Sequence, residues 1–231
     1  MKSNKFIKQH FENMFKDKNE VLDTFKRGLG IKDSKIANII KNAKPKDKIC
    51  LDIGPGNGRW INFFKGFDCK KIFALDISEN VKEKCQGLCD DFFLMDLENQ
   101  AIPIKSNSVD IIIAVEVIEH IRDSKEFLKE ILRVSKPGGL ILLTMPNIVS
   151  LISRIRMFFG ILPVAISSDK THVKFYRQKD IRKILLSLNY KVKFHPTSFS
   201  LNPMNPKSKL RIKSNSFLSS FDDSHLFTIY K

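Results

Sequence analysis

The chain has 231 residues, of which 42% are hydrophobic, and its 40 Lys and Arg residues against 25 Asp and Glu residues give a net charge of +15. This composition excludes a globally disordered chain, and the length favours one domain, residues 1–231, with a complete α/β core. The sequence contains no uninterrupted run of about 18 apolar residues, so we predict no transmembrane helix. The charged start, Met1 to Lys5, leads into no apolar signal-peptide core, so we expect a cytoplasmic protein.

The N-terminal segment is predicted to be helical. Apolar residues recur at helical spacing between residues 5 and 29, and a further helix is predicted from Asp33 to Asn42, before Pro45. We interpret residues 1–46 as a helical cap, which either covers the substrate side of the protein or simply packs on the sheet.

A short strand and a glycine-rich turn come next. The apolar run Ile49 to Ile53 ends in three glycines spaced two apart, a helix is predicted over Arg59 to Lys65, and the following strand ends at Asp76. Glycine is needed where the backbone takes positive φ or approaches a bound group closely. An Asp at the end of the second strand of such a unit is placed to bind the two hydroxyls of a ribose. The spacing is not the G-x-G-x-x-G of dinucleotide-binding folds, and no Gly-Lys-Ser/Thr ending indicates a phosphate-binding loop.

The rest of the chain alternates strands and helices, which implies a parallel sheet. Lys136 to Gly139 is predicted to end a helix, because Pro cannot continue it and Gly supplies a left-handed cap. Two of the predicted helices have their first serine as N-cap. The predicted helices are Ser78–Gln86, Ser124–Val134 and Gln178–Leu188, and the predicted strands are Phe92–Glu98, Ser108–Val115, Leu140–Thr144, Tyr190–His195 and His225–Tyr230.

The order of these features resembles the class I S-adenosylmethionine-dependent methyltransferases. The glycine turn after an acidic strand resembles the first motif of that family, and the third strand ends at the position of the residue that faces the adenine. The resemblance covers roughly residues 47–195. It implies a doubly wound, seven-stranded Rossmann-like sheet of order 3-2-1-4-5-7-6 with an antiparallel last strand, and S-adenosylmethionine as cofactor. The residues that it places at the cofactor are Asp52, Gly54, Pro55, Gly56, Asn57, Gly58, Asp76, Ile77, Asp96, Leu97, Val115 and Glu116.

A cluster of acidic residues and histidines is the candidate for the chemical step. Glu116, Glu119 and His120 follow the fourth strand at a spacing that shares one face if the turn is helical, and His172 can approach from a later segment. Oxygen and nitrogen nucleophiles often need a general base, so we predict Glu119, His120 and His172 as catalytic residues, without a metal.

Two alternatives for this cluster stay open. A Glu-x-x-Glu-His motif with a distant His resembles the metal cluster of small-RNA terminal 2′-O-methyltransferases, and also a motif of ubiquinone-type O-methyltransferases. Two carboxylates and two imidazoles can hold Mg²⁺ or Mn²⁺. Alternatively, Glu119 only caps or pairs locally and His120 only packs near the cofactor.

Residues 146–174 are interpreted as a substrate-side insertion. The segment is largely apolar, and Arg154 and Arg156 are its only charges before Asp169. It forms either a lid or interfacial helix at a membrane or a lipid-like substrate, or a helix that packs on the domain. The later loop Pro196–Ser216 is predicted to be exposed and mobile.

The cysteines give no metal-binding pattern. Cys85 and Cys89 are the closest pair in the sequence, and their spacing on a predicted helix is only a weak redox or metal signal. We expect all four cysteines, which also include Cys50 and Cys69, to be free thiols in a reducing compartment.

The positive charge lies in the two flanks of the chain. Residues 1–48 have 13 Lys and Arg against 6 Asp and Glu, residues 49–169 have 14 against 16, and residues 170–213 have 12 against 1. Such a field attracts anionic partners, although a Lys-rich composition imposed by an A/T-rich genome explains it equally well. Lys exceeds Arg and the aromatic residues are mostly Phe, which does not favour a nucleic-acid surface.

These observations together predict a methyltransferase. We expect methyl transfer from S-adenosylmethionine to a small-molecule, lipid-linked or glycan acceptor, with oxygen as the accepting atom and a peripheral contact with an anionic membrane as a further partner. The alternatives are an RNA 2′-O-methyltransferase with a Glu/His metal site, and a non-catalytic cofactor-binding protein of the same fold.

Overall fold

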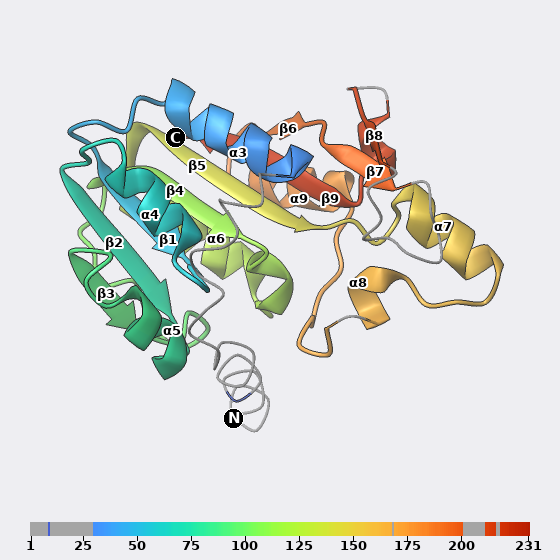
Figure 1. Cartoon of the computed structure of the whole chain (residues 1–231), viewed down its shortest axis with the longest axis horizontal. Coiled ribbons are helices and arrows are strands. Elements are labelled where there is room, and N and C mark those ends of the chain that lie inside the picture. The colour runs from blue at the N-terminus through green and yellow to red at the C-terminus, as the bar shows by residue number, and fades with distance from the viewer. Residues whose placement is uncertain (1–8, 10–29, 168, 201–210, 216–217) are drawn as a thin grey trace.

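The computed structural model describes residues 9, 30–167, 169–200, 211–215 and 218–231 (Figure 1). Most of the helical cap predicted for residues 1–46 therefore lies outside the described residues, and its last helix is α3. The helices are α3 (Ile31–Asn42), α4 (Arg59–Lys65), α5 (Glu79–Cys85), α6 (Ser124–Val134), α7 (Leu151–Phe158), α8 (Val164–Ser167) and α9 (Gln178–Ser187), with short 3₁₀ helices η2 (Ile118–His120) and η3 (Ser219–Phe221).

The main sheet has seven strands in the order β3-β2-β1-β4-β5-β9-β6. Strands β1 to β5 are parallel, and β9 is antiparallel to both of its neighbours. In chain order β6 and β9 are the sixth and seventh strands of this sheet, so the predicted order and the antiparallel last strand are confirmed. The strands are β1 (Ile49–Ile53), β2 (Lys71–Asp76), β3 (Asp91–Leu94), β4 (Val109–Val115), β5 (Ser135–Pro146), β6 (Lys193–His195) and β9 (Ser224–Tyr230).

Helices cover both faces of the sheet, as the apolar strands require. One core cluster joins α6 and α9 to the sheet through residues such as Leu128 and Ile181. A second cluster on the other face includes Ile36 of α3, Ile61 of α4 and Val81 of α5. The carboxyl ends of β1, β2 and β4 are left at one edge between these layers, where doubly wound sheets bind their ligands (Figure 1).

Two local predictions were wrong. The N-cap of α6 is Asp123, whose carboxylate accepts from the amide of Glu126, and Ser124 is the first helical residue. The Lys136–Gly139 segment does not end α6, which stops at Val134, but begins β5. Its positive φ at Gly138 allows this segment to exchange backbone hydrogen bonds with Lys231.

The loop predicted over Pro196–Ser216 contains regular structure in its described part. The short strands β7 (Ser198–Ser200) and β8 (Arg211–Lys213) pair as an antiparallel ribbon. The segment 146–174 contains α7 and α8, which lie beyond the carboxyl end of β5 at one end of the molecule (Figure 1). Among the described residues, no helix combines the length and the apolar character needed to cross a membrane.

Candidate active site

The glycine turn between β1 and α4 is shaped by positive φ angles. Gly54, Gly56 and Gly58 have φ of 67°, 55° and 72°. A Cβ atom on Gly54 would lie 2.7 Å from Cγ2 of Val117, and one on Gly58 would lie 2.9 Å from Cδ1 of Leu88. The turn therefore excludes side chains at both of these positions for two reasons, backbone conformation and space.

A cavity of about 440 Å³ opens beside this turn, at the carboxyl ends of β1, β2 and β4. Its volume is in the usual range of small-molecule sites. Most of the residues predicted from the sequence line it: Gly54, Pro55, Gly56, Asn57, Asp76, Ile77, Asp96, Leu97, Val115, Glu116, Glu119, His120 and His172. Asp52 and Gly58 do not.

Asp52 lies beneath the turn, and its surroundings differ from those of the residues that line the cavity. Its carboxylate is buried and interacts with the backbone amide of Ile61 in the first turn of α4. Gly58, the N-cap of that helix, has no side chain to accept such a bond, so Asp52 supplies the acceptor. Burial raises the pKa of Asp52 to about 8, although Arg59 nearby lowers it.

Two further carboxylates reach the cavity from the ends of neighbouring strands. Asp76 ends β2 and accepts from the amide of Ser78, which caps α5. Asp96 follows β3 and accepts from the amide of Glu98. Both are held by the residue two positions later, so their positions are set by the local sequence.

Glu116 is the first residue after β4 and has a φ of +57°. Oε1 of Glu116 accepts from Nζ of Lys32 at 2.8 Å and from the hydroxyl of Thr144 at 2.7 Å. Burial would raise the pKa of this carboxyl, but Lys32 and the two hydrogen bonds outweigh burial and lower it. Glu116 thus ties α3 to the end of β4 as an anion.

Glu119 has the opposite surroundings. It lies in η2 and is 2% exposed, and neither of its carboxylate oxygens has a hydrogen-bond partner among the described residues. Nε2 of His172 lies 3.9 Å from its Oε1. Burial, reinforced by the charge of Glu116, raises the pKa of Glu119 well above its ordinary value. The sequence predicted that Glu116, Glu119 and His120 share one face if this turn is helical. The turn is only a short 3₁₀ helix that begins at Ile118, so Glu116 does not share a helical face with the other two.

Both histidines are oriented through Nδ1. Nδ1 of His120 lies 3.2 Å from the carbonyl oxygen and 3.0 Å from the hydroxyl oxygen of Thr171, and that hydroxyl donates to Asp169. Nδ1 of His172 lies 2.6 Å from the carbonyl oxygen of Ala165 in α8. A carbonyl oxygen can only accept, so both Nδ1 atoms carry the hydrogen, and in the neutral rings the lone pair is on Nε2.

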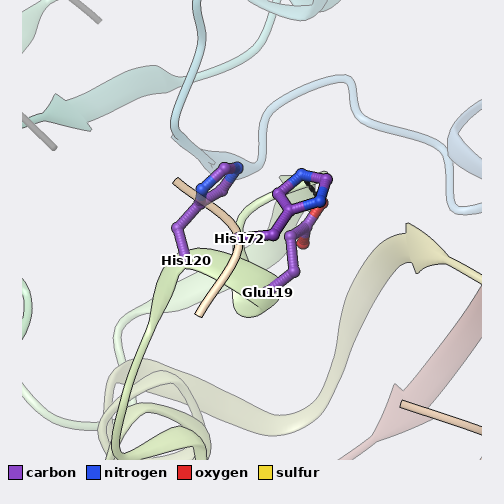
Figure 2. Close-up of side chains that lie close together, drawn as sticks. All are labelled: Glu119, His120 and His172. Carbon is purple, nitrogen blue, oxygen red and sulfur yellow. Dashed lines mark ion pairs between the residues drawn. The ribbon is translucent and has the colours of Figure 1, made fainter. Parts of the chain in front are cut away.

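The three residues form one compact cluster beside the cavity. One ligand atom from each of Glu119, His120 and His172 lies within 4.8 Å of the others. Figure 2 shows Glu119 and His172 facing each other, with His120 alongside, and the two imidazole centroids are 4.8 Å apart. Backbone bonds from the amides of Val173 and Lys174 to the carbonyl of Glu119 fix the two segments together. Glu116, which was predicted as a fourth member, is not part of this group.

Several other residues that line the cavity were not predicted from the sequence. Lys32 and Arg59 are the most consequential, because Lys32 pairs with Glu116 and Arg59 pairs with Asp33 at 2.9 Å. Both ion pairs tie α3 to residues that line the cavity, Glu116 and Arg59. The sequence shows that α3 contains charged residues, but it does not show which residues they pair with. The remaining additional lining residues are Trp60, Leu75, Met95, Glu98, Val117, Ile121 and Asp169.

Comparisons with known proteins agree with this architecture. The family model described as a methyltransferase domain matches residues 30–193. Norajmaline N-methyltransferase of Rauvolfia serpentina is 34% identical over 119 residues, which are 47% of this chain and 39% of that protein. A tRNA (carboxymethyluridine(34)-5-O)-methyltransferase of Mus musculus is 31% identical over 100 residues, which are 42% of this chain and 14% of that protein. The chain thus spans well under half the length of these curated relatives.

A solved structure supports the fold over a longer stretch. The SAM-dependent methyltransferase from Archaeoglobus fulgidus superposes with a TM-score of 0.65, at 19% identity, over 86% of this chain and 92% of that one. Because the family model covers more than half of the sequence, the chain belongs to the methyltransferase domain family. The fold and family predicted from the sequence are confirmed, and S-adenosylmethionine is the cofactor of this family.

Proposed function

We propose that this protein transfers the methyl group of S-adenosylmethionine to an oxygen of a small-molecule, lipid-linked or glycan acceptor. The observation that carries the proposal is one cavity with two kinds of lining: a glycine turn on one side, and the Glu119–His120–His172 cluster on the other. The related proteins act on different acceptors, one as an N-methyltransferase and one on a tRNA uridine, so the acceptor is inferred from the site.

The glycine turn and two carboxylates fit the cofactor. Gly54 lines the cavity without a side chain, so its backbone can lie directly against a ligand. We assign Asp76 to the ribose hydroxyls and the Asp96–Leu97 pair to the adenine, as expected for the ends of adjacent parallel strands. Asp52 acts indirectly, since it holds the start of α4 beneath the turn. When bound, S-adenosylmethionine supplies an activated methyl group, so the protein has only to orient the acceptor and remove its proton.

His120 is our candidate for the base. Its Nδ1 hydrogen is directed to Thr171, which leaves the basic lone pair on Nε2. Burial and the neighbouring His172 lower its pKa, which favours the neutral form that accepts a proton. A hydroxyl acceptor needs this help more than an uncharged amine does, because an amine already has an available lone pair. We assign Glu119 and His172 to binding of the acceptor hydroxyl beside His120.

Labelled cofactor tests this function directly. The protein is incubated with methyl-labelled S-adenosylmethionine and with metabolite, lipid and RNA extracts, and each fraction is analysed by mass spectrometry. We expect label on an oxygen in the metabolite or lipid fraction, and its loss in His120→Ala. Label on nitrogen or confined to RNA would contradict the proposed acceptor. Cofactor binding without labelling of any fraction would favour a non-catalytic protein.

The cluster also supports a second candidate, an RNA 2′-O-methyltransferase with a bound metal. Glu119 offers a buried carboxylate without a hydrogen-bond partner in the part of the chain that the structure describes, and both histidines direct Nδ1 to a carbonyl, as metal-bound histidines usually do. Two imidazoles and one carboxylate suit Mn²⁺ better than Mg²⁺, which prefers oxygen ligands. Glu116 is held by Lys32 and Thr144 and is not assigned as a ligand.

Metal binding can be measured apart from turnover. Titration with Mn²⁺ followed by electron paramagnetic resonance should show one tight site in the wild type and none in Glu119→Gln if this second candidate is correct. Chelator should then abolish methylation of RNA, and Mn²⁺ should restore it. Methylation of a small hydroxyl acceptor that resists chelator would instead support the metal-free base.

A further inference from the structure

The end of α7 and the turn after it expose four large apolar side chains, which we call the apolar tip. Met157, Phe158, Phe159 and Leu162 are 47%, 84%, 68% and 60% exposed. Single apolar residues are common on protein surfaces, but a contiguous group of this kind marks an interaction site. Figure 1 shows α7 and α8 at one end of the molecule, beyond the main sheet, where the tip can reach a large partner.

The tip is held in shape by its own hydrogen bonds. The amide of Ile161 donates to the carbonyl of Arg156 at 2.8 Å, and Nε of Arg156 donates to the carbonyl of Leu162 at 2.9 Å. The rings of Phe158 and Phe159 meet edge to face, with centroids 5.3 Å apart. At the other end of α7, Ile152 is buried and anchors the helix. The apolar side chains are therefore presented by an ordered turn.

The segment that carries the tip is rich in basic residues. Residues 148–177 include five Lys and Arg residues, one Asp and no Glu. Lys170, which follows α8, is exposed. An amphipathic segment with Phe and Leu on one side and basic residues beside them has the composition of a peripheral anchor to anionic lipid. A second copy of the same surface would bring like charges together, which disfavours self-association through the tip.

We propose that the apolar tip inserts into the headgroup region of an anionic phospholipid membrane. Phe158, Phe159 and Leu162 enter the boundary of the acyl chains, and basic side chains of residues 148–177 lie at the lipid phosphates. This contact does not depend on the proposed methyl transfer. It has a consequence for that function, because α8 links the tip to the cavity wall through the bond between Ala165 and His172.

Vesicle sedimentation of the full chain tests the contact. The protein is mixed with vesicles of phosphatidylcholine, with and without phosphatidylglycerol, at low and at physiological salt. We expect binding only to the anionic vesicles, weakened by salt. Phe158→Ser/Phe159→Ser should bind about 100-fold more weakly, since each buried Phe contributes about a factor of ten. Leu186→Ser, on α9 and 56% exposed, is the matched control and should bind like the wild type.

Three results would overturn the proposal. One is equal binding of the wild type to both kinds of vesicle. Another is binding of Phe158→Ser/Phe159→Ser to anionic vesicles that is as strong as that of the wild type. The third is a dimer of the wild type in light scattering that Phe158→Ser/Phe159→Ser converts to a monomer, since a second copy would then cover the tip. Circular dichroism of each variant establishes that the fold is intact, which these exposed positions should permit.

Discussion

The two walls of the cavity are built in different ways. The turn wall consists of the Gly54–Gly58 turn with Asp76 and Asp96, and both carboxylates accept from amides two positions later in the sequence. The cluster wall consists of Glu116–His120 with His172, and distant segments assemble it around a carboxylate that has no hydrogen-bond partner among the described residues. Buried groups with perturbed ionisation are typical of sites of chemistry. The comparison suggests that the turn wall binds and that the cluster wall reacts.

The largest expected effect comes from the cluster wall. His120→Ala removes the proposed base and should lower turnover by about 10²–10⁴-fold. Affinity for S-adenosylmethionine should stay nearly constant, because the glycine turn is untouched. Steady-state kinetics and calorimetry on the same preparations measure both quantities. His195→Gln is a control, because His195 does not line the cavity. Unchanged turnover in His120→Ala would assign this residue a packing role only.

The turn wall should respond in the opposite way. Asp76→Ala removes the proposed acceptor for the ribose hydroxyls, which should cost about 2–3 kcal/mol of cofactor binding. That loss corresponds to about 30–150-fold in Kd. Turnover at saturating cofactor should fall much less than in His120→Ala. Calorimetry that finds the same Kd for Asp76→Ala and the wild type would contradict the assignment and remove the contrast between the walls.

The smallest functional effect is expected beneath the turn wall, at Asp52. Its pKa is raised from 3.8 to about 8 in the folded protein, so the native state holds a proton that the unfolded chain has released. Stability of the cofactor-free protein should therefore decrease as the pH rises from about 4 to about 8. Asp52→Asn keeps an acceptor for Ile61 but cannot ionise.

Thermal unfolding across this pH range tests the linkage. The melting temperature of the wild type should fall by several degrees more than that of Asp52→Asn, while turnover changes little at neutral pH. Parallel pH profiles for the two proteins would show that Asp52 does not titrate as inferred. A profile that rises with pH only in the wild type would mean that the anion is stabilised in the fold.

The sequence predicted the turn wall better than the cluster wall, for a physical reason. The glycines are required by the local backbone conformation, and the Ser78 cap and the strand-ending Asp76 depend on neighbours within a few residues, so their pattern is readable. The pairing of Lys32 with Glu116 spans 84 residues, and that of His120 with Thr171 spans 51. No local pattern specifies such contacts, since they require the fold.

Smaller errors came from residues that serve two structures equally well. Asp123 and Ser124 are both good caps, and the sequence alone does not decide which of them precedes the first turn. Lys136–Gly139 has the composition of a helix end, but its pairing with Lys231 makes it the start of a strand. Lys231 lies far along the chain from this segment, so no local rule anticipates the pairing.

The position of β9 between β5 and β6 has a consequence for synthesis. Each of β2 to β5 pairs with a strand that is made before it, but β6 joins the sheet only through β9, which is made later. A ribosome adds residues 224–230 after all other strands, so the apolar edge of β5 stays unpaired until then. We expect nascent chains that lack this strand to bind chaperones through β5, and slow synthesis of the region after β6 to lengthen that exposure.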